Sequence, residues 1–142
     1  MTMLPFKINA VVACDDIRLE VNNKAMLIGV YNGAMVVGGF PSDLRLAWWI
    51  QIFAEQPEKY DLEARVLKDG NSTLVRAQLV VDIKTSGWSS IILPPAPIQL
   101  QSSGRLDLEM RLKDAGKWDT IATVDVREGE VFGALPVPSQ PS

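Results

Sequence analysis

The chain has 142 residues, of which 47% are hydrophobic and 22% are charged, a composition typical of a folded globular domain. It contains one cysteine and no histidine, which excludes an internal disulfide and leaves zinc, haem and iron–sulfur sites without their usual donors. A formal net charge of -3, with lysine and arginine spread along the chain, argues against nucleic acid as a partner.

No apolar run approaches the roughly 20 residues that a membrane-spanning helix needs, so we expect no membrane partner. Val11–Cys14 looks like the short box that precedes a lipidated cysteine. Only six residues, one of them Asn9, lie between Lys7 and Cys14, too few for the apolar part of a secretory signal. We therefore expect a cytoplasmic protein.

The first segment alternates with a period of two, which indicates a β-strand. The parity changes at Asp15 and Asp16, so we expect a bulge or a bend there. Asn22 and Asn23 then predict a hairpin turn, and Lys24–Tyr31 is the expected returning strand. The apolar row of the first strand contains Phe6, Ile8, Ala10, Val12 and Cys14.

Glycines at 33, 38 and 39 predict a loop or a weak strand around residues 35–37. Ser42 and Asp43 are the candidate start of a single helical turn. The segment Leu44–Glu55 is apolar on both faces of an expected strand. Because neighbouring strand residues point to opposite faces, placing Trp48 in the core leaves Trp49 and Phe53 together outside.

Two clear hairpins follow. Tyr60–Leu67 and Leu74–Lys84 alternate on either side of a turn at residues 69–72, and Leu106–Lys113 pairs in the same way with Trp118–Arg127. Between the hairpins, the prolines at 94, 95 and 97 predict a sheet edge or a crossing between sheets. Ile98–Gln101 is expected to resume the extended chain.

About eight short strands with polar outer faces predict an all-β fold, an antiparallel β-sandwich of immunoglobulin-like or related type. A small closed β-barrel is the alternative. We expect one domain over residues 1–134, followed by a tail rich in proline and serine at residues 135–142.

The chain lacks histidine, the usual general acid and base at neutral pH, and we expect no enzyme activity, no catalytic residue and no cofactor. Cys14 lies in an apolar row, which favours a buried, unreactive thiol over a nucleophile. Calcium needs only oxygen ligands, which loops at one end of a sandwich can supply. The acids that could gather there are Asp15, Asp16, Asp43, Asp69 and Asp114.

Two parts of the chain carry a resemblance. The hairpin around CDDIRLEVNNKAMLIGVY (residues 14–31), together with Leu93–Pro95, Gly104–Leu106 and the hairpin at Trp118, resembles an uncharacterised bacterial family of small all-β proteins, a domain of unknown function. The resemblance implies a bacterial source and a compact, mostly β single domain. It implies no catalytic residue, and the tail lies outside it.

These observations favour a non-enzymatic protein that works through its surface. A joined patch of exposed aromatic side chains usually marks an interface, so Trp49 and Phe53 are the expected interface residues, toward a protein partner or a homo-oligomer, unless a loop such as Pro94–Pro97 covers them. The alternative is a module that binds a small ligand or calcium through loops at one end of the sandwich.

Overall fold

The computed structural model describes residues 4–31 and 33–130, so the tail predicted for residues 135–142 lies outside the described part. Within these ranges the chain is almost entirely β, with one 3₁₀ turn and no α-helix. No helix there is long and apolar enough to cross a bilayer. The elements are β1 (Lys7–Leu19), η1 (Val21–Asn23), β2 (Ala25–Val30), β3 (Met35–Val37), β4 (Ser42–Ala54), β5 (Glu58–Lys68), β6 (Ser72–Ile83), β7 (Gly87–Leu100), β8 (Gly104–Leu112) and β9 (Asp119–Glu128).

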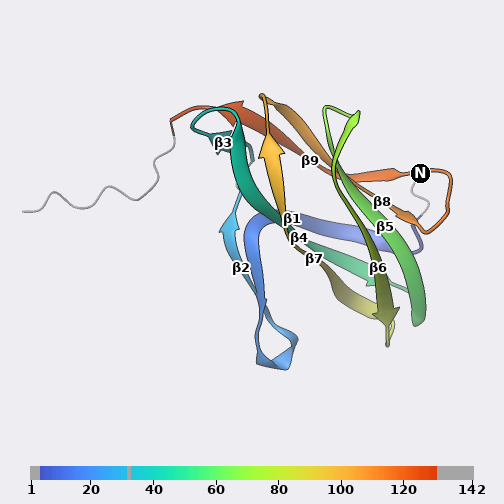
Figure 1. The fold of residues 1–142 in the computed structure, drawn as a ribbon. Coiled ribbons are helices and arrows are strands. Elements are labelled where there is room, and N and C mark those ends of the chain that lie inside the picture. Colours follow the sequence, from blue (N-terminus) through green and yellow to red (C-terminus); the bar gives the residue numbers. More distant parts are fainter. Residues whose placement is uncertain (1–3, 32, 131–142) are drawn as a thin grey trace, which may run out of the picture.

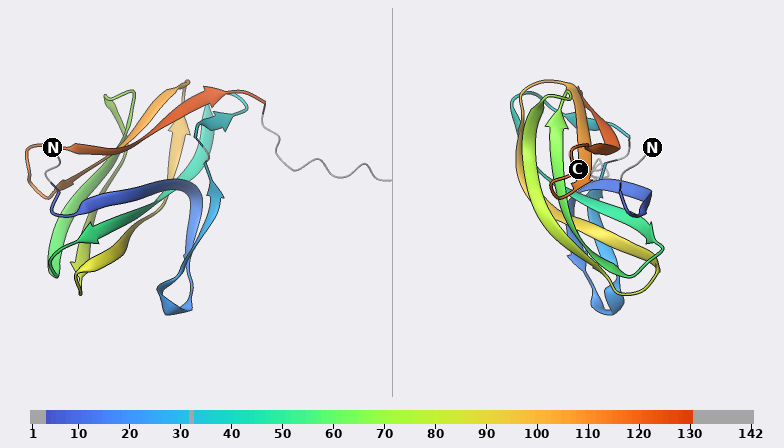
Figure 2. Two further views of the ribbon diagram at one scale, coloured as in Figure 1. Left: turned by 180° about the vertical axis from the view of Figure 1, so that it is seen from behind. Right: turned by 90° about the vertical axis from the view of Figure 1, so that its right-hand side faces the viewer.

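The strands form two sheets that face each other, with strand orders β2-β1-β4-β7 and β3-β9-β8-β5-β6 (Figure 1). Neighbouring strands are antiparallel except β3 and β9, which are parallel. β1 bends sharply, so its second half leaves the body of the sandwich together with β2 (Figures 1 and 2). The predicted all-β sandwich is confirmed.

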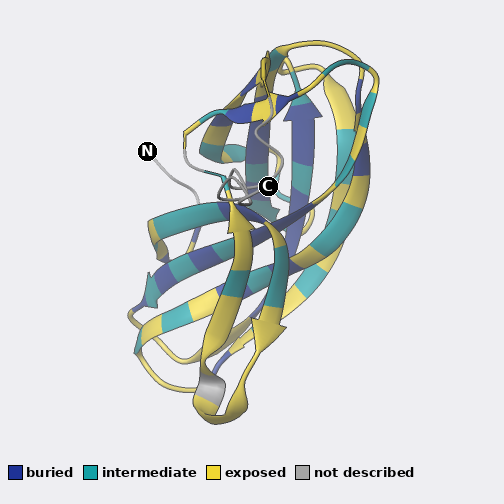
Figure 3. Ribbon diagram, turned by 90° about the vertical axis from the view of Figure 1, so that its left-hand side faces the viewer, coloured by how far each residue is buried: buried dark blue, intermediate teal, exposed yellow. Residues whose placement is uncertain are grey.

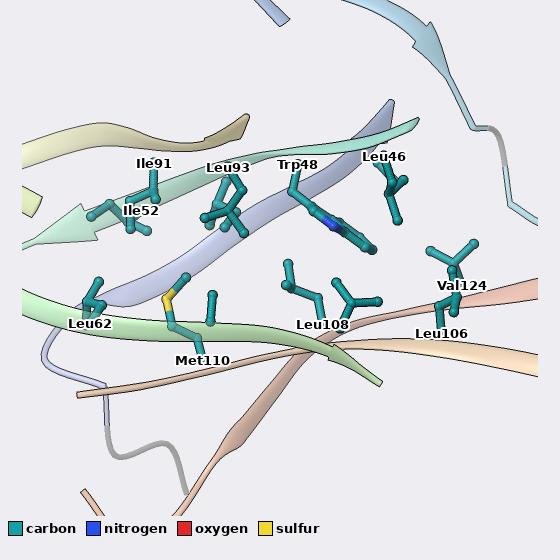
Figure 4. Packing of buried hydrophobic residues seen from close by; sticks show 14 of the residues in the cluster. Leu46, Trp48, Ile52, Leu62, Ile91, Leu93, Leu106, Leu108, Met110 and Val124 are labelled. Atoms are coloured by element: carbon teal, nitrogen blue, oxygen red, sulfur yellow. The ribbon is translucent and has the colours of Figure 1, made fainter. Parts of the chain in front are cut away.

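Alternating side chains from both sheets fill the space between them (Figure 4). Trp48 of β4 is 3% exposed and points toward β8, where Leu108 is fully buried. Burial of each large aliphatic side chain stabilises the fold by about 1.5–3 kcal/mol, so this layer holds the two sheets together. Its members include Leu46, Ile50 and Ile52 from β4, Leu62 and Val66 from β5, and Leu106 and Met110 from β8.

The two predicted hairpins are confirmed. In β5–β6, Leu62 lies opposite Leu79 and Ala64 opposite Ala77, as the alternating pattern requires. The turn uses positive φ at Asp69 (54°) and Gly70 (75°), a combination that suits the twist of a tight hairpin. β8 and β9 form the second hairpin.

The predicted edge at the prolines is also confirmed. β7 is the outermost strand beside β4 and continues through Pro94, Pro95 and Pro97 to Leu100. The pairing with β4 is irregular between Leu46 and Trp48, opposite these prolines.

Two local predictions are wrong, namely which β1 side chains after Ile8 face the core and the helical turn at Ser42. Of the bulge or bend expected at Asp15 and Asp16, the bulge is absent, since β1 and β2 keep one register there, while β1 does bend before its second half (Figure 1). A register shift in the pairing with β4 lies instead between Ile8 and Ala10. The side chains that follow this shift therefore point to the opposite faces from those that strict alternation predicts. The second error is at Ser42, where β4 begins and no helical turn forms.

The shift in β1 changes which residues face the core. Val11 lies opposite Ile50 on the core side, whereas Val12 lies opposite Trp49 on the outer side. The predicted row therefore holds up to Ile8 and fails at Ala10 and Val12. Cys14 is nevertheless completely buried.

Candidate functional site

A projecting hairpin, residues 15–30, is the most distinctive feature of the surface; we call it the arm (Figures 1 and 2). At its tip Asn22 adopts φ 69° and ψ 31°, the left-handed conformation that asparagine tolerates well. The Glu20 N–H donates a 2.8 Å hydrogen bond to the Lys24 carbonyl and closes the turn. The turn predicted at Asn22 is thus confirmed.

The base of the arm is held by Asp15 and Tyr31. The Tyr31 hydroxyl donates a 2.7 Å hydrogen bond to Asp15 Oδ1, and its backbone N–H donates one of 3.0 Å to the Ala13 carbonyl. Partial burial, followed by the Asp15 carboxylate, raises the pKa of Tyr31 well above its usual value. Gly29, at φ +69°, leaves the space that the Asp15 carboxylate occupies.

Beyond this base the arm exposes apolar side chains. Val21 at the tip is 84% exposed and Leu19 is 73% exposed. An isolated two-stranded ribbon is at best marginally stable in water. Both strands of the arm are exposed over most of their length (Figure 3). The other exposed apolar residues of the arm are Met26, Ile28 and Val30.

A hollow of about 580 Å³ lies beside the arm on the outer face of the four-stranded sheet; we call it the aromatic hollow. Leu19 lines it from the arm, so the hollow and the arm form one continuous surface. Its other lining residues are Trp49, Gln51, Trp88, Ser89, Ser90 and Ile92.

The predicted interface residues Trp49 and Phe53 both lie on this outer face, and both are half-buried. Phe53 contacts Trp88 edge to face, with ring centroids 5.0 Å apart and an interplanar angle of 73°. Trp88 is 63% exposed and was missed by the sequence analysis. A signal existed in the sequence, since Trp88 lies in the segment between the first predicted hairpin and the prolines at 94, 95 and 97.

The acids proposed for calcium do not come together. Asp69 lies at the β5–β6 turn, where it accepts a 2.9 Å hydrogen bond from the Arg105 N–H and pairs with Lys68 at 2.8 Å. Asp114 follows the opposite end of β8. Within residues 4–31 and 33–130, no group of three or more His, Cys, Asp or Glu side chains is placed to hold a metal ion.

Cys14 is fully enclosed where β1 lies between β2 and β4. Burial, and then the nearby Asp15 carboxylate, raises the pKa of its thiol. Because the thiolate is the reactive form, both effects suppress nucleophilic chemistry.

A charged cluster on the outer face of the five-stranded sheet was not foreseen. Glu63, only 3% exposed, pairs with Arg76 at 2.8 Å and with Arg111 at 3.4 Å. The guanidinium groups of Arg65 and Arg111 lie 4.1 and 4.2 Å from the ring centroid of Trp118. The charged groups of this cluster pair with one another. Because partly buried charges on a sheet face need such partners, we interpret the cluster as structural.

No family model and no curated protein matches the chain. The resemblance to the bacterial family of unknown function therefore stays a prediction.

Proposed function

We propose that this protein is a non-enzymatic interaction module that associates with a second copy of itself through the arm and the aromatic hollow. The observation that carries the proposal is the exposed apolar surface of the arm, from Leu19 and Val21 at the tip to Val30 at the base. Exposed apolar surface of this kind typically marks an interaction site.

The free energy gained by covering apolar side chains, compared with the cost of association, favours a symmetric contact. Full coverage of one aliphatic side chain is worth about 1.5–3 kcal/mol, and the five that the arm exposes are divided between its two faces, with Leu19 on one face and Met26 and Ile28 on the other. Bringing two proteins together costs about 4–15 kcal/mol, so coverage of one arm leaves little net stability. A symmetric contact covers the same surface in both copies and doubles the gain.

The absence of histidine and the enclosure of Cys14 support a non-enzymatic role. The single cysteine supports a cytoplasmic location, because free thiols are typical of proteins in a reducing compartment. The expected bacterial origin belongs to the same proposal and rests on the hairpin motif alone.

Sedimentation equilibrium of the wild type beside Trp49→Asp and Val21→Asp tests the proposal. We expect a wild-type dimer, and folded monomers for both variants, because each places a carboxylate in the apolar contact. Val80→Asp is the matched control, since Val80 is 57% exposed on β6, far from the arm in the strand order. A wild type that stays monomeric at high concentration, with native circular dichroism, contradicts self-association.

A second candidate function follows from the lining of the aromatic hollow. Two indole rings stand beside Gln51, Ser89 and Ser90, a mixture of flat apolar faces and polar groups that suits a small polyhydroxylated ring compound. The Gln51 amide oxygen already accepts a hydrogen bond from the Asn9 side chain, which holds it in place. Titration of the tryptophan fluorescence with simple sugars tests this candidate, with Trp88→Ala as the variant that should lose the response.

A further inference from the structure

A pocket of about 220 Å³ opens between the two sheets, at the side of the sandwich formed by the edge strands β6 and β7. We call it the core pocket, and we propose that it binds a small uncharged apolar molecule of the size of a single aromatic ring. The arm lies at the other edge of the four-stranded sheet, and the aromatic hollow lies on the outer face of that sheet. The inference is therefore independent of the proposed self-association.

The core pocket runs from the surface into the buried layer between the sheets. Among its lining residues, Trp48 and Ala64 are 3% and 2% exposed and Leu108 is fully buried, whereas Ala77 is half-buried and Pro94 is exposed. Trp48 points from β4 toward Leu108 on the facing sheet (Figure 4). A ligand that enters between β6 and β7 would thus reach side chains of the core.

Three alanines leave the space that forms the core pocket. They are Ala64 on β5, Ala77 on β6 and Ala96 on β7. Ala77 lies opposite Ala64, and Ala96 lies opposite the buried Leu46, so all three side chains face the interior. The interior positions two residues away on β5 and β6 carry leucine or valine. Side chains of that size at the three alanine positions would fill the pocket.

A β-bulge with two prolines forms one wall of the core pocket. The partners of Leu46 and Trp48 on β7 are separated by two residues, Pro94 and Pro95, where β4 has only one. Bulges of this kind are frequent beside functional sites. Because the proline rings fix φ, this wall is rigid and little conformational freedom is lost when a ligand binds.

The lining of the core pocket selects against charge in the ligand. Of the lining residues only Arg65 and Arg76 are charged. Their guanidinium groups lie 4.1 and 5.7 Å from the ring centroid of Trp118, on the outer face of the sheet, while the adjacent Ala64 and Ala77 face the interior. An ionised ligand would therefore be buried without a partner for its charge, which is costly.

The volume of the core pocket limits the ligand to a few atoms. Sites for drug-sized molecules have volumes of roughly 300–1,000 Å³, which is larger than this pocket. An apolar cavity of roughly 150 Å³ can accept benzene. One aromatic ring with a small substituent fits between these limits, and toluene is the matching probe.

Nuclear Overhauser effects between toluene and the wild-type protein test the site without any substitution. We expect contacts from the ring protons of toluene to the methyl groups of Ala77 and Leu93, on the two sides of the core pocket. Absence of these contacts up to the solubility limit of toluene overturns the proposal. Benzoate has the same ring with a carboxylate, and we expect it to bind at least about tenfold more weakly than toluene. Equal affinity for benzoate overturns the selection against charge.

Variants that fill the core pocket should weaken the binding of toluene. We expect Ala77→Leu to lower the affinity at least about tenfold, because the larger side chain would occupy the site. Ala96→Val fills the pocket from the opposite sheet and gives an independent test in case the first variant does not fold. Val80→Leu enlarges an outward side chain of the same strand β6 and should leave the affinity unchanged. Unchanged affinity in a folded Ala77→Leu or Ala96→Val variant overturns the proposal.

Trp88→Ala distinguishes the core pocket from the aromatic hollow. Trp88 lines the hollow and not the pocket, so this variant should bind toluene as the wild type does. Loss of toluene binding in Trp88→Ala would place the ligand in the hollow and overturn the proposal.

Discussion

The Glu63 carboxylate on β5 accepts a 2.8 Å hydrogen bond from the Arg76 guanidinium on the neighbouring strand β6. The backbone N–H of Asp114 donates a second hydrogen bond, of 3.2 Å, to the same carboxylate. The Arg76 contact first, and then that of Asp114, lowers the pKa of Glu63 from 4.5 to about 2.

This relationship predicts a loss of stability in acid. Because the pKa of Glu63 is lower in the folded chain, the unfolded chain binds more protons between pH 4.5 and about 2. The stabilisation is therefore complete above pH 4.5 and disappears as the pH falls toward 2. Glu63→Gln should flatten this part of the curve in urea unfolding measured from pH 2 to pH 7.

Glu55→Gln removes an exposed carboxylate of the same type at the turn between β4 and β5 and serves as the control. An acid limb that stays the same in Glu63→Gln would show that the Arg76 contact contributes nothing to the pH dependence.

Gly29→Ala should destabilise the base of the arm. The added Cβ would contact the Asp15 carboxylate, and alanine is strained at φ +69°. We expect a loss of about 1 kcal/mol or more in the free energy of unfolding. Gly33→Ala is a matched control, because Gly33 has φ +80° with nothing near its added Cβ, so only backbone strain remains. Equal losses in the two variants would argue against the Asp15 contact.

Trp48 and Trp88 should respond very differently to truncation. Trp48 is 3% exposed in the layer between the sheets, and Trp48→Ala should cost about 3–5 kcal/mol. Trp88 is 63% exposed and contacts Phe53, so Trp88→Ala should cost no more than about 1 kcal/mol. Chemical denaturation of both variants measures the difference, and similar losses would mean that the two indoles have been assigned to the wrong environments.

Cys14 should react with thiol reagents only when the chain opens. Its side chain is fully enclosed, and burial raises the pKa of the thiol. The modification rate should therefore rise with denaturant in parallel with unfolding. Val80→Cys adds an exposed thiol as the control and should react at once. Rapid labelling of Cys14 in native buffer would refute the assignment.

Local patterns predicted the hairpins well. The β5–β6 and β8–β9 pairs alternate over most of their length, with one register shift in each, and the Asp69–Gly70 turn has the residues that a tight hairpin demands. The prediction of which β1 side chains face the core failed, because residues 10–13 are all apolar and local alternation cannot decide between them. The irregularity after Ile8 depends on pairing with β4, far along the chain.

The candidate surface could be predicted only in part. Alternation in β4 placed Trp49 and Phe53 on one outer face, because that relationship lies within a single strand. The contact of Phe53 with Trp88 depends on the register between β4 and β7, and the hollow depends on the bend that brings Leu19 toward Trp49. Both are set by pairings between distant residues, which one sequence does not reveal.

The most direct test of self-association is to remove the arm while keeping its base. A variant in which Asn-Gly replaces residues 18–26 would join Ile17 to Leu27, which lie opposite each other, through a two-residue hairpin turn. The account predicts a concentration-independent monomer with the unfolding behaviour of the sandwich retained, beside a dimeric wild type, in sedimentation equilibrium. A shortened variant that is folded and still dimeric would contradict the claim that the arm carries the association.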